Sequence, residues 1–170
     1  MRFLWYNKGM RIQKLTKSYI KDISSICTNA FLDGEYSFYL QKGNLGGLDK
    51  FLDFCSVKNL TQKMLDGKYM FFGALEENTL VGTACINSKN GNILLLFVDI
   101  DYQKQGVGKM LVSFLIGLAK ELGLKKLTVD ATHFGVNFYE KMGFEKLSEE
   151  QMLEGGLIFT PMRKMIQIKK

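Results

Sequence analysis

The 170-residue sequence contains a single proline and no long apolar run. One proline leaves no room for a Pro-rich linker, and no repeat of fixed period is present, so we expect one domain over residues 1–170. The longest uncharged apolar stretch, residues 110–119, is too short to span a bilayer. The first residues lack the apolar core and cleavage site of a signal peptide. These absences favour a soluble, cytoplasmic chain with no membrane partner.

Cysteine and histidine are also scarce. Cys27, Cys55 and Cys85 are the three cysteines, and none belongs to a CxxC pair. His133 is the single histidine. An odd number of widely spaced cysteines does not indicate a disulfide framework or a zinc site, so we expect free buried thiols and no bound metal.

The charge is positive but dispersed. The formal net charge is +6, and only residues 2–21 and 163–170 are clearly basic. Elsewhere Lys and Arg alternate with Asp and Glu, and no nucleic-acid-binding module is recognisable. We therefore expect no nucleic-acid partner, whereas a mild positive field suits an anionic cofactor.

The order of the expected elements indicates an α/β fold (α+β) with a mixed, partly antiparallel central sheet flanked by helices. A first strand over 10–15 precedes a helix that Thr16 or Ser18 can cap and that runs through residue 31. Residues 34–47 read as a glycine-rich loop, and residues 48–67 as one broken helix or two short ones. The rest follows as three antiparallel strands over 68–100, a helix over 106–122, a strand over 125–131, a helix over 135–142 and strands over 144–148 and 156–162.

The segment QKQGVGK lies between a strand that is apolar on both faces and a helix, and this arrangement is typical of a phosphate-binding turn. A Walker A loop would need Ser or Thr after GK, where Met110 stands. A Rossmann turn would need a third glycine where Leu111 stands, although Asp130 ends the next strand at the place of a ribose-binding acid. The Walker A interpretation fails, and the Rossmann interpretation, which would make the protein a nucleotide-linked oxidoreductase, stays as a weak alternative.

A third interpretation fits the turn better. Gln103-x-x-Gly106-x-Gly108 resembles the acetyl-CoA pyrophosphate loop of the GNAT acetyltransferase superfamily. The later segment NFYEKMGFEKL resembles the second signature of that superfamily, and the element order matches it from Met10 to Met162. The resemblance implies an acetyl-CoA-dependent N-acetyltransferase that transfers directly to an amine in a ternary complex.

The resemblance also implies roles for individual residues. Tyr139 matches the tyrosine that the family uses as a general acid towards the CoA sulfur. A bulge in the central strand should expose backbone N–H groups around Val98 to Ile100. The residues implied to bind the cofactor are Val98, Ile100, Gln103, Lys104, Gln105, Gly106, Val107, Gly108, Lys109 and His133.

The general base and the acceptor stay open. Candidate bases are Asp33, Glu35, Asp99, His133, which replaces a family asparagine, or a chain of water molecules. Residues 31–40 supply acidic and aromatic side chains that suit a small-molecule amine. A non-catalytic acyl-CoA-binding regulatory module is the main alternative function, and a homodimer is left open.

Overall fold

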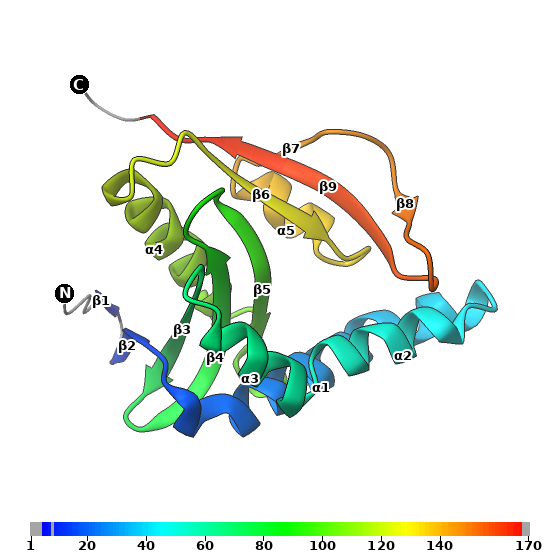
Figure 1. The fold of residues 1–170 in the computed structure, drawn as a ribbon, viewed down its shortest axis with the longest axis horizontal. Helices are drawn as coiled ribbons and strands as arrows, with labels where there is room; N and C mark the ends of the chain where they lie inside the picture. The colour runs from blue at the N-terminus through cyan, green and yellow to red at the C-terminus, as the bar shows by residue number, and fades with distance from the viewer. Residues whose placement is uncertain (1–4, 8, 168–170) are drawn as a thin grey trace.

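A twisted sheet with strand order β1-β2-β3-β4-β5-β6-β9-β7 runs through the molecule, and β8 pairs with β9 (Figure 1). The computed structural model describes residues 5–7 and 9–167. The strands are β1 (Trp5–Asn7), β2 (Met10–Lys14), β3 (Tyr69–Glu76), β4 (Thr79–Asn87), β5 (Asn92–Val98), β6 (Lys126–Ala131), β7 (Glu145–Lys146), β8 (Gln151–Met152) and β9 (Ile158–Met165). The helices are α1 (Ile20–Gln41), α2 (Leu45–Phe54), α3 (Val57–Leu65), α4 (Val107–Glu121) and α5 (Val136–Lys141), with 3₁₀ turns η1 (Lys17–Tyr19) and η2 (Ile100–Tyr102).

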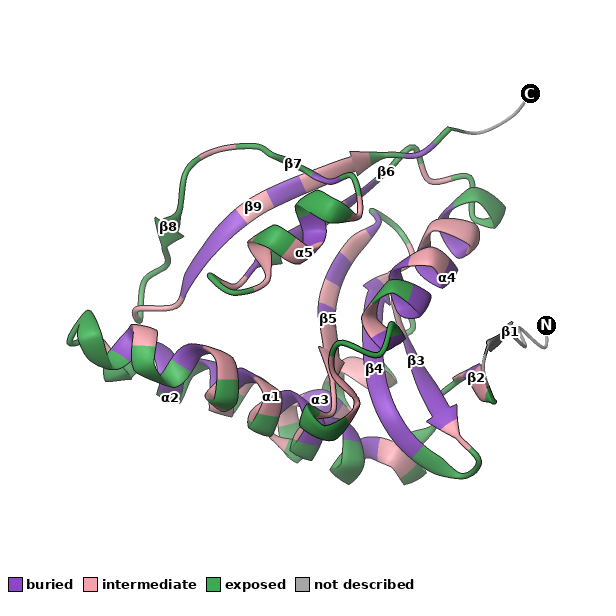
Figure 2. Cartoon of the chain, turned by 180° about the vertical axis from the view of Figure 1, so that it is seen from behind, coloured by how far each residue is buried: buried purple, intermediate pink, exposed green. Residues whose placement is uncertain are grey.

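The helices form two layers, one on each face of the sheet. Buried side chains of α4 and α5 pack with one set of strand residues, among them Val129 and Ala131 of β6. Side chains of α1, α2 and α3 pack with a second set, among them Leu95 of β5. Figure 2 shows β4 buried along most of its length, whereas β5 alternates between buried and half-buried residues. The half-buried residues Leu94, Leu96, Phe97 and Val98 mark the part of β5 that is not fully covered.

Helices cover both faces of β5, which is why it is apolar on both, and a bulge sets which residue faces which layer. Cys85 of β4 pairs with Leu95, but Ile86 pairs with Ile93, so Leu94 is one extra residue in β5. Since side chains alternate along a strand, the extra residue reverses which face the following side chains point to. Ile93 therefore packs under α4, whereas Leu95 packs under α1.

The parallel pairing of β5 with β6 is short. It joins Asn92 to Thr128 and Ile93 to Val129, and the two strands separate beyond that point. All other strand pairs in the described residues are antiparallel. The expected mixed, partly antiparallel sheet is confirmed, and β5–β6 is its parallel pair.

The segment over residues 34–47, expected as a loop, is mostly helical. Helix α1 continues to Gln41 because Phe31, Glu35 and Tyr39 recur every four residues and are all buried on one face. Gly34 lies inside the helix, and the nearest atom to a Cβ there would be 4.0 Å away on Phe134. Glycine frequency in this stretch therefore misled the prediction of a loop.

Several boundaries also differ from the expectation. Neither Thr16 nor Ser18 caps α1 through its side chain; the two hydroxyls bond each other at 2.8 Å. The broken helix is two helices, α2 and α3, and Asn44 and Ser56 cap them. Of the two expected final strands, the first is the two-residue strand β7, and the second, β9, extends to Met165. The short strands β1 and β8 were not expected.

Candidate functional site

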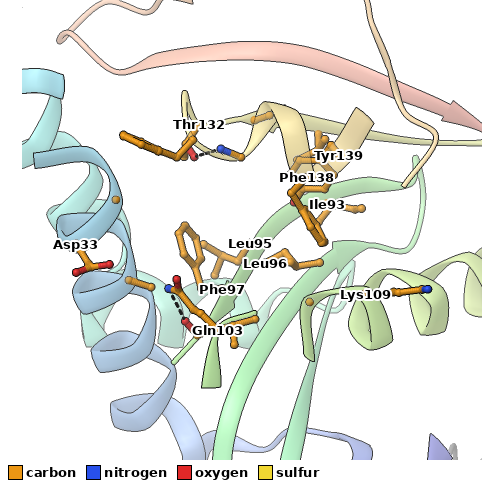
Figure 3. Close-up of a pocket in the computed structure, with 18 of the residues that line it drawn as sticks. Asp33, Ile93, Leu95, Leu96, Phe97, Gln103, Lys109, Thr132, Phe138 and Tyr139 are labelled. Atoms are coloured by element: carbon orange, nitrogen blue, oxygen red, sulfur yellow. Dashed lines mark hydrogen bonds between the residues drawn. The ribbon is translucent and has the colours of Figure 1, made fainter. Parts of the chain in front are cut away.

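A cavity of about 820 Å³ opens where β5 and β6 separate (Figure 3). Its walls come from α1, α2, β5, η2 and the loop after it, the start of α4, β6, the loop before α5, and α5 itself. Figure 3 shows Phe138 and Tyr139 facing β5 from α5, and Asp33 on α1 at the opposite side. A volume of this size is typical of sites for small molecules and cofactors.

The glycine loop forms one end of the cavity. Gly106 is the N-cap of α4 with φ of 92°, a backbone conformation that favours glycine, and Lys104 also has positive φ, 58°. Met110 donates the first helical hydrogen bond, to the Gly106 carbonyl at 2.9 Å. The N–H groups of residues 107–109 precede it and have no carbonyl of α4 to bind, so the loop is suited to an anion.

Six of the predicted cofactor-binding residues line this cavity: Val98, Gln103, Lys104, Gly106, Gly108 and Lys109. Gln105 and Val107 do not. The Gln105 side chain donates to the Asp101 carbonyl at 2.8 Å, and the Val107 side chain is buried in the core. These two residues can contribute backbone atoms to the loop, but their side chains are used elsewhere.

The end of β5 offers fewer backbone donors than expected. The N–H of Asp99 donates to the Val81 carbonyl at 2.9 Å, so it pairs with the neighbouring chain. Because successive N–H groups of a strand point to opposite sides, the N–H of Val98 points away from β4, to the open side. The Val98 carbonyl points to the same side and accepts a hydrogen bond from Gln103 Nε2 at 3.4 Å. Ile100 lies in η2, is exposed and does not line the cavity. The bulge lies at Leu94 and not at these residues.

Tyr139 lines the cavity from α5. Its ring is 6% exposed and makes edge contacts with Phe138 and Phe144, both with centroids 5.2 Å apart. Burial raises the pKa of its phenol well above the ordinary value. Among the described residues the Tyr139 hydroxyl has no hydrogen-bond partner. The hydroxyl is therefore protonated at neutral pH and available to a ligand.

The structure separates the candidate bases. Asp33 lines the cavity, but Glu35, Asp99 and His133 do not. Asp99 caps η2, where its Oδ1 accepts from the Asp101 N–H at 3.0 Å. Asp33 is therefore the member of this group that reaches the cavity.

Glu35 instead joins α1 to the loop before α5. The residue is 2% exposed, and its Oε1 accepts a hydrogen bond from the Phe134 N–H at 3.0 Å. Its other oxygen, Oε2, is buried with no partner. Burial raises the pKa of Glu35, and the bond from Phe134 opposes that rise.

His133, expected to bind the cofactor arm, points elsewhere. Its ring stacks on Phe38 with centroids 4.1 Å apart, and its Nδ1 lies 3.2 Å from Glu150 Oε2. Lys42 Nζ lies 3.1 Å from the other oxygen of Glu150. The side chain of His133 thus ties α1 to the segment before β8, and His133 does not line the cavity.

Asp130 and Thr132 were not predicted to belong to an acetyl-CoA site, although Asp130 was considered as a ribose-binding acid. Asp130 and Thr132 line the cavity from the end of β6 and the loop after it. The strand KLTVDA predicts that Asp130 lies on the face opposite Val129, but the sequence does not show that β5 leaves this face open. The missing information was the short pairing of β5 with β6.

No group of three His, Cys, Asp or Glu side chains in the described part of the chain could hold a metal ion. No described helix is long and apolar enough to cross a membrane.

The sequence profile of the acetyltransferase (GNAT) domain matches residues 38–166. The chain belongs to the GNAT acetyltransferase family. A Bacillus subtilis relative named as an acetyltransferase is 32% identical over 93 residues, which cover 54% of this chain and 63% of that protein. The match thus spans less than two thirds of that relative.

Two further GNAT relatives are informative. Glucosamine 6-phosphate N-acetyltransferase of Schizosaccharomyces pombe is 32% identical over 85 residues, 45% of this chain and 77% of that enzyme. The structure of PaiA N-acetyltransferase from Thermoplasma acidophilum, in complex with coenzyme A, superposes with a TM-score of 0.74 at 17% identity. That superposition covers 92% of this chain and 98% of the other, and it shows a shared fold.

Proposed function

We propose that this GNAT protein transfers an acetyl group from acetyl-CoA to the amine of a small molecule. The observation that carries the proposal is one cavity with a glycine loop at one end and the Tyr139 side chain in its wall. The same cavity opens between strands that separate, which leaves room for an extended chain beside β5.

The residues present fit acetyl-CoA. The N–H groups at the start of α4 and the side chains of Lys104 and Lys109 suit the pyrophosphate. Half-buried Leu96 and Val98 offer apolar contacts to the pantetheine arm, and the Val98 N–H and C=O point to its side. Acetyl-CoA supplies the activated thioester, and the protein has to orient it and exclude water.

The positions of the three cysteines support direct transfer, without an acetylated cysteine as intermediate. Cys27, Cys55 and Cys85 are free, buried and outside the cavity lining. Burial raises the pKa of Cys27 and Cys85 far above the usual range, so neither provides a thiolate at neutral pH. An intact-mass measurement after incubation with acetyl-CoA alone tests this; one acetyl group on a cysteine, removed by an amine, would contradict it.

Tyr139 is the residue that we expect to assist departure of the thiol. Its raised pKa keeps the hydroxyl protonated, but it also makes complete proton transfer to a thiolate of pKa about 8.5 unfavourable. We therefore assign Tyr139 to hydrogen-bond donation towards the sulfur as the C–S bond breaks.

The acceptor end of the cavity combines one carboxylate with aromatic walls. Asp33 lies there with Phe51, Phe97 and Phe134. Carboxylate and aromatic groups favour a cationic, partly apolar amine over a phosphorylated one. The glucosamine 6-phosphate relative therefore supports an amine acceptor in general, and not its own substrate for this chain.

A thiol-release assay with acetyl-CoA and a panel of primary amines tests the proposed function. Turnover of at least one small amine, at a rate well above hydrolysis of acetyl-CoA, is the expected result. Tight binding of acetyl-CoA in calorimetry without turnover of any amine would instead indicate a regulatory CoA-binding module.

A further inference from the structure

Asp130 is the carboxylate that β6 presents to the cavity. Leu127, Val129 and Ala131 are buried in the core formed with α4 and α5. Because side chains alternate along a strand, Asp130 points to the other face, towards the layer of α1, α2 and α3. Its pairing partner on β9 is Pro161, whose ring has no N–H. Among the described residues the Asp130 carboxyl group has neither a hydrogen-bond nor an ion-pair partner.

The two sides of the opening between β5 and β6 thus carry complementary groups. Tyr139 packs in the core that contains Val129 and Ala131, on the side of α4 and α5. Asp130 lies on the opposite side, where Asp33 of α1 also lines the cavity. In attack on a thioester, the sulfur leaves from one side of the carbonyl carbon and the amine approaches from another. A donor on one side of the sheet and an acceptor on the other match these two requirements.

The environment of Asp130 suits a base. Asp130 is exposed to the water of the open cavity, and partial burial of its carboxyl group raises the pKa, with no opposing bond or cation. The other titratable groups of the cavity wall are Asp33 on α1, Tyr102, Lys104 and Lys109 around the glycine loop, and Tyr139 on α5. Glu35, Asp99 and His133 do not line the cavity, and each is held by a bond to another residue.

We propose that Asp130 is the catalytic base, which accepts the proton that the acceptor nitrogen loses as its bond to the acetyl carbon forms. This role rests on the acetyl transfer proposed above. A neutral amine forms the N–C bond and the C–S bond breaks. One N–H proton passes to the Asp130 carboxylate, and the sulfur leaves as a thiolate that accepts a hydrogen bond from Tyr139. Solvent then removes the proton from Asp130 and protonates the thiolate, so atoms and charges balance.

The matched pair Asp130→Asn and Asp33→Asn tests the assignment with the best amine of the panel. Both variants remove one carboxylate from the same cavity, one from β6 and one from α1. We expect Asp130→Asn to lower kcat at least 100-fold and to abolish the acidic limb of the kcat/KM profile. Asp33→Asn should raise KM while it keeps that limb. Asp49→Asn, an exposed position on α2, is the neutral control.

Two measurements exclude a merely structural effect. Affinity for CoA in calorimetry should be the same in wild type and Asp130→Asn, because Asp130 makes no bond whose loss disturbs the fold. Asp130→Ala should regain activity when formate is added, since a free carboxylate can enter the space of the missing one. No rescue by formate, in a variant that binds CoA normally, would count against a proton acceptor at this position.

The remaining outcomes are also decisive. Activity of Asp130→Asn within threefold of wild type would overturn the assignment, and loss of the acidic limb in Asp33→Asn alone would transfer the role to Asp33. If wild type turns over no amine at all, the proposed function itself is wrong and the role of Asp130 falls with it.

Discussion

Glu35 Oε1 accepts a hydrogen bond of 3.0 Å from the backbone N–H of Phe134, a residue 99 positions later in the chain. The bond attaches α1 to the loop between β6 and α5. That loop continues into a turn in which the Gly135 N–H donates to the Thr132 carbonyl at 2.9 Å. The Tyr139 N–H then donates to the Gly135 carbonyl at 3.1 Å. Glu35 therefore fixes the start of the helix that carries Tyr139.

Glu35→Gln should change how stability depends on pH. The pKa of Glu35 is raised in the folded state, so the folded protein holds this proton more tightly than the unfolded chain does. Its contribution to stability is complete below the unfolded pKa of about 4.3 and is lost as pH rises through the folded pKa. Gln cannot titrate but keeps an oxygen for the Phe134 N–H. The melting temperature of Glu35→Gln minus that of wild type should thus rise from about pH 4 to about pH 7.

The exposed Glu149 provides the control, because Glu149→Gln should give a nearly constant difference over the same range. Glu35→Ala leaves the Phe134 N–H without its acceptor, at a cost of about 1–3 kcal/mol. Hydrogen exchange should then accelerate in residues 134–139. A Glu35→Gln difference that stays flat with pH would show that Glu35 is already ionised without penalty.

Gly47 and Gly46 form a second matched pair. A Cβ on Gly47 would collide with the Tyr39 ring and the Gly156 carbonyl, whereas a Cβ on Gly46 would meet its nearest atom at 3.7 Å. Overpacking of this kind typically costs about 1–3 kcal/mol, and each kcal/mol lowers Tm by about 2–4 °C in a chain of this size. Thermal melts should show that loss for Gly47→Ala and no loss for Gly46→Ala. Equal melting temperatures would mean that α2 does not dock on the β8–β9 turn.

The sequence predicted the glycine loop and the sheet well because both depend on local patterns. Gly106 has the positive φ that a tight turn before a helix requires, and β5 has apolar residues on both faces. The prediction failed for residues 34–41, where the glycine content of residues 34–47 suggested a loop. There a buried stripe against the sheet maintains the helix, and only tertiary packing reveals it.

The site shows the same limit. Val98, Gln103 and Gly108 could be placed from motifs, but the sequence did not show which carboxylates face the cavity. Glu35 and Asp33 are two residues apart, yet one is buried against Phe134 and the other lines the cavity. Their separation depends on the helical turn between them and on contacts with segments about 100 residues later. A short sequence motif does not predict long-range contacts of this kind.

Gly108→Val should weaken CoA binding. A Cβ at this position lies 3.3 Å from the Phe138 ring and 3.7 Å from Val98, both of which line the cavity. The two methyl groups of valine would displace the Phe138 ring and cover the N–H groups at the start of α4. We expect at least tenfold weaker binding in calorimetry, or about 1.4 kcal/mol. Gly117→Val on the same helix, where a Cβ meets nothing within 4 Å, should bind CoA as wild type does.

Unchanged affinity in a folded Gly108→Val protein would falsify the placement of the pyrophosphate on this loop. A loss of affinity in both valine variants would point to general damage to α4, which a parallel thermal melt would detect.

Tyr139→Phe tests the role assigned to the hydroxyl. The ring contacts with Phe138 and Phe144 remain, and no hydrogen bond within the described residues is lost, so Tm and CoA affinity should barely move. Loss of a positioned donor commonly costs about 10²–10³ in kcat. We expect a fall of about 10- to 1,000-fold, because a thiolate of pKa about 8.5 is a tolerable leaving group without help.

Tyr36→Phe, at an exposed position on α1, should keep full activity. The comparison requires conditions in which chemistry limits turnover, which a single-turnover measurement establishes. Full kcat in Tyr139→Phe under those conditions would mean that the ring only packs and that water assists the departing sulfur.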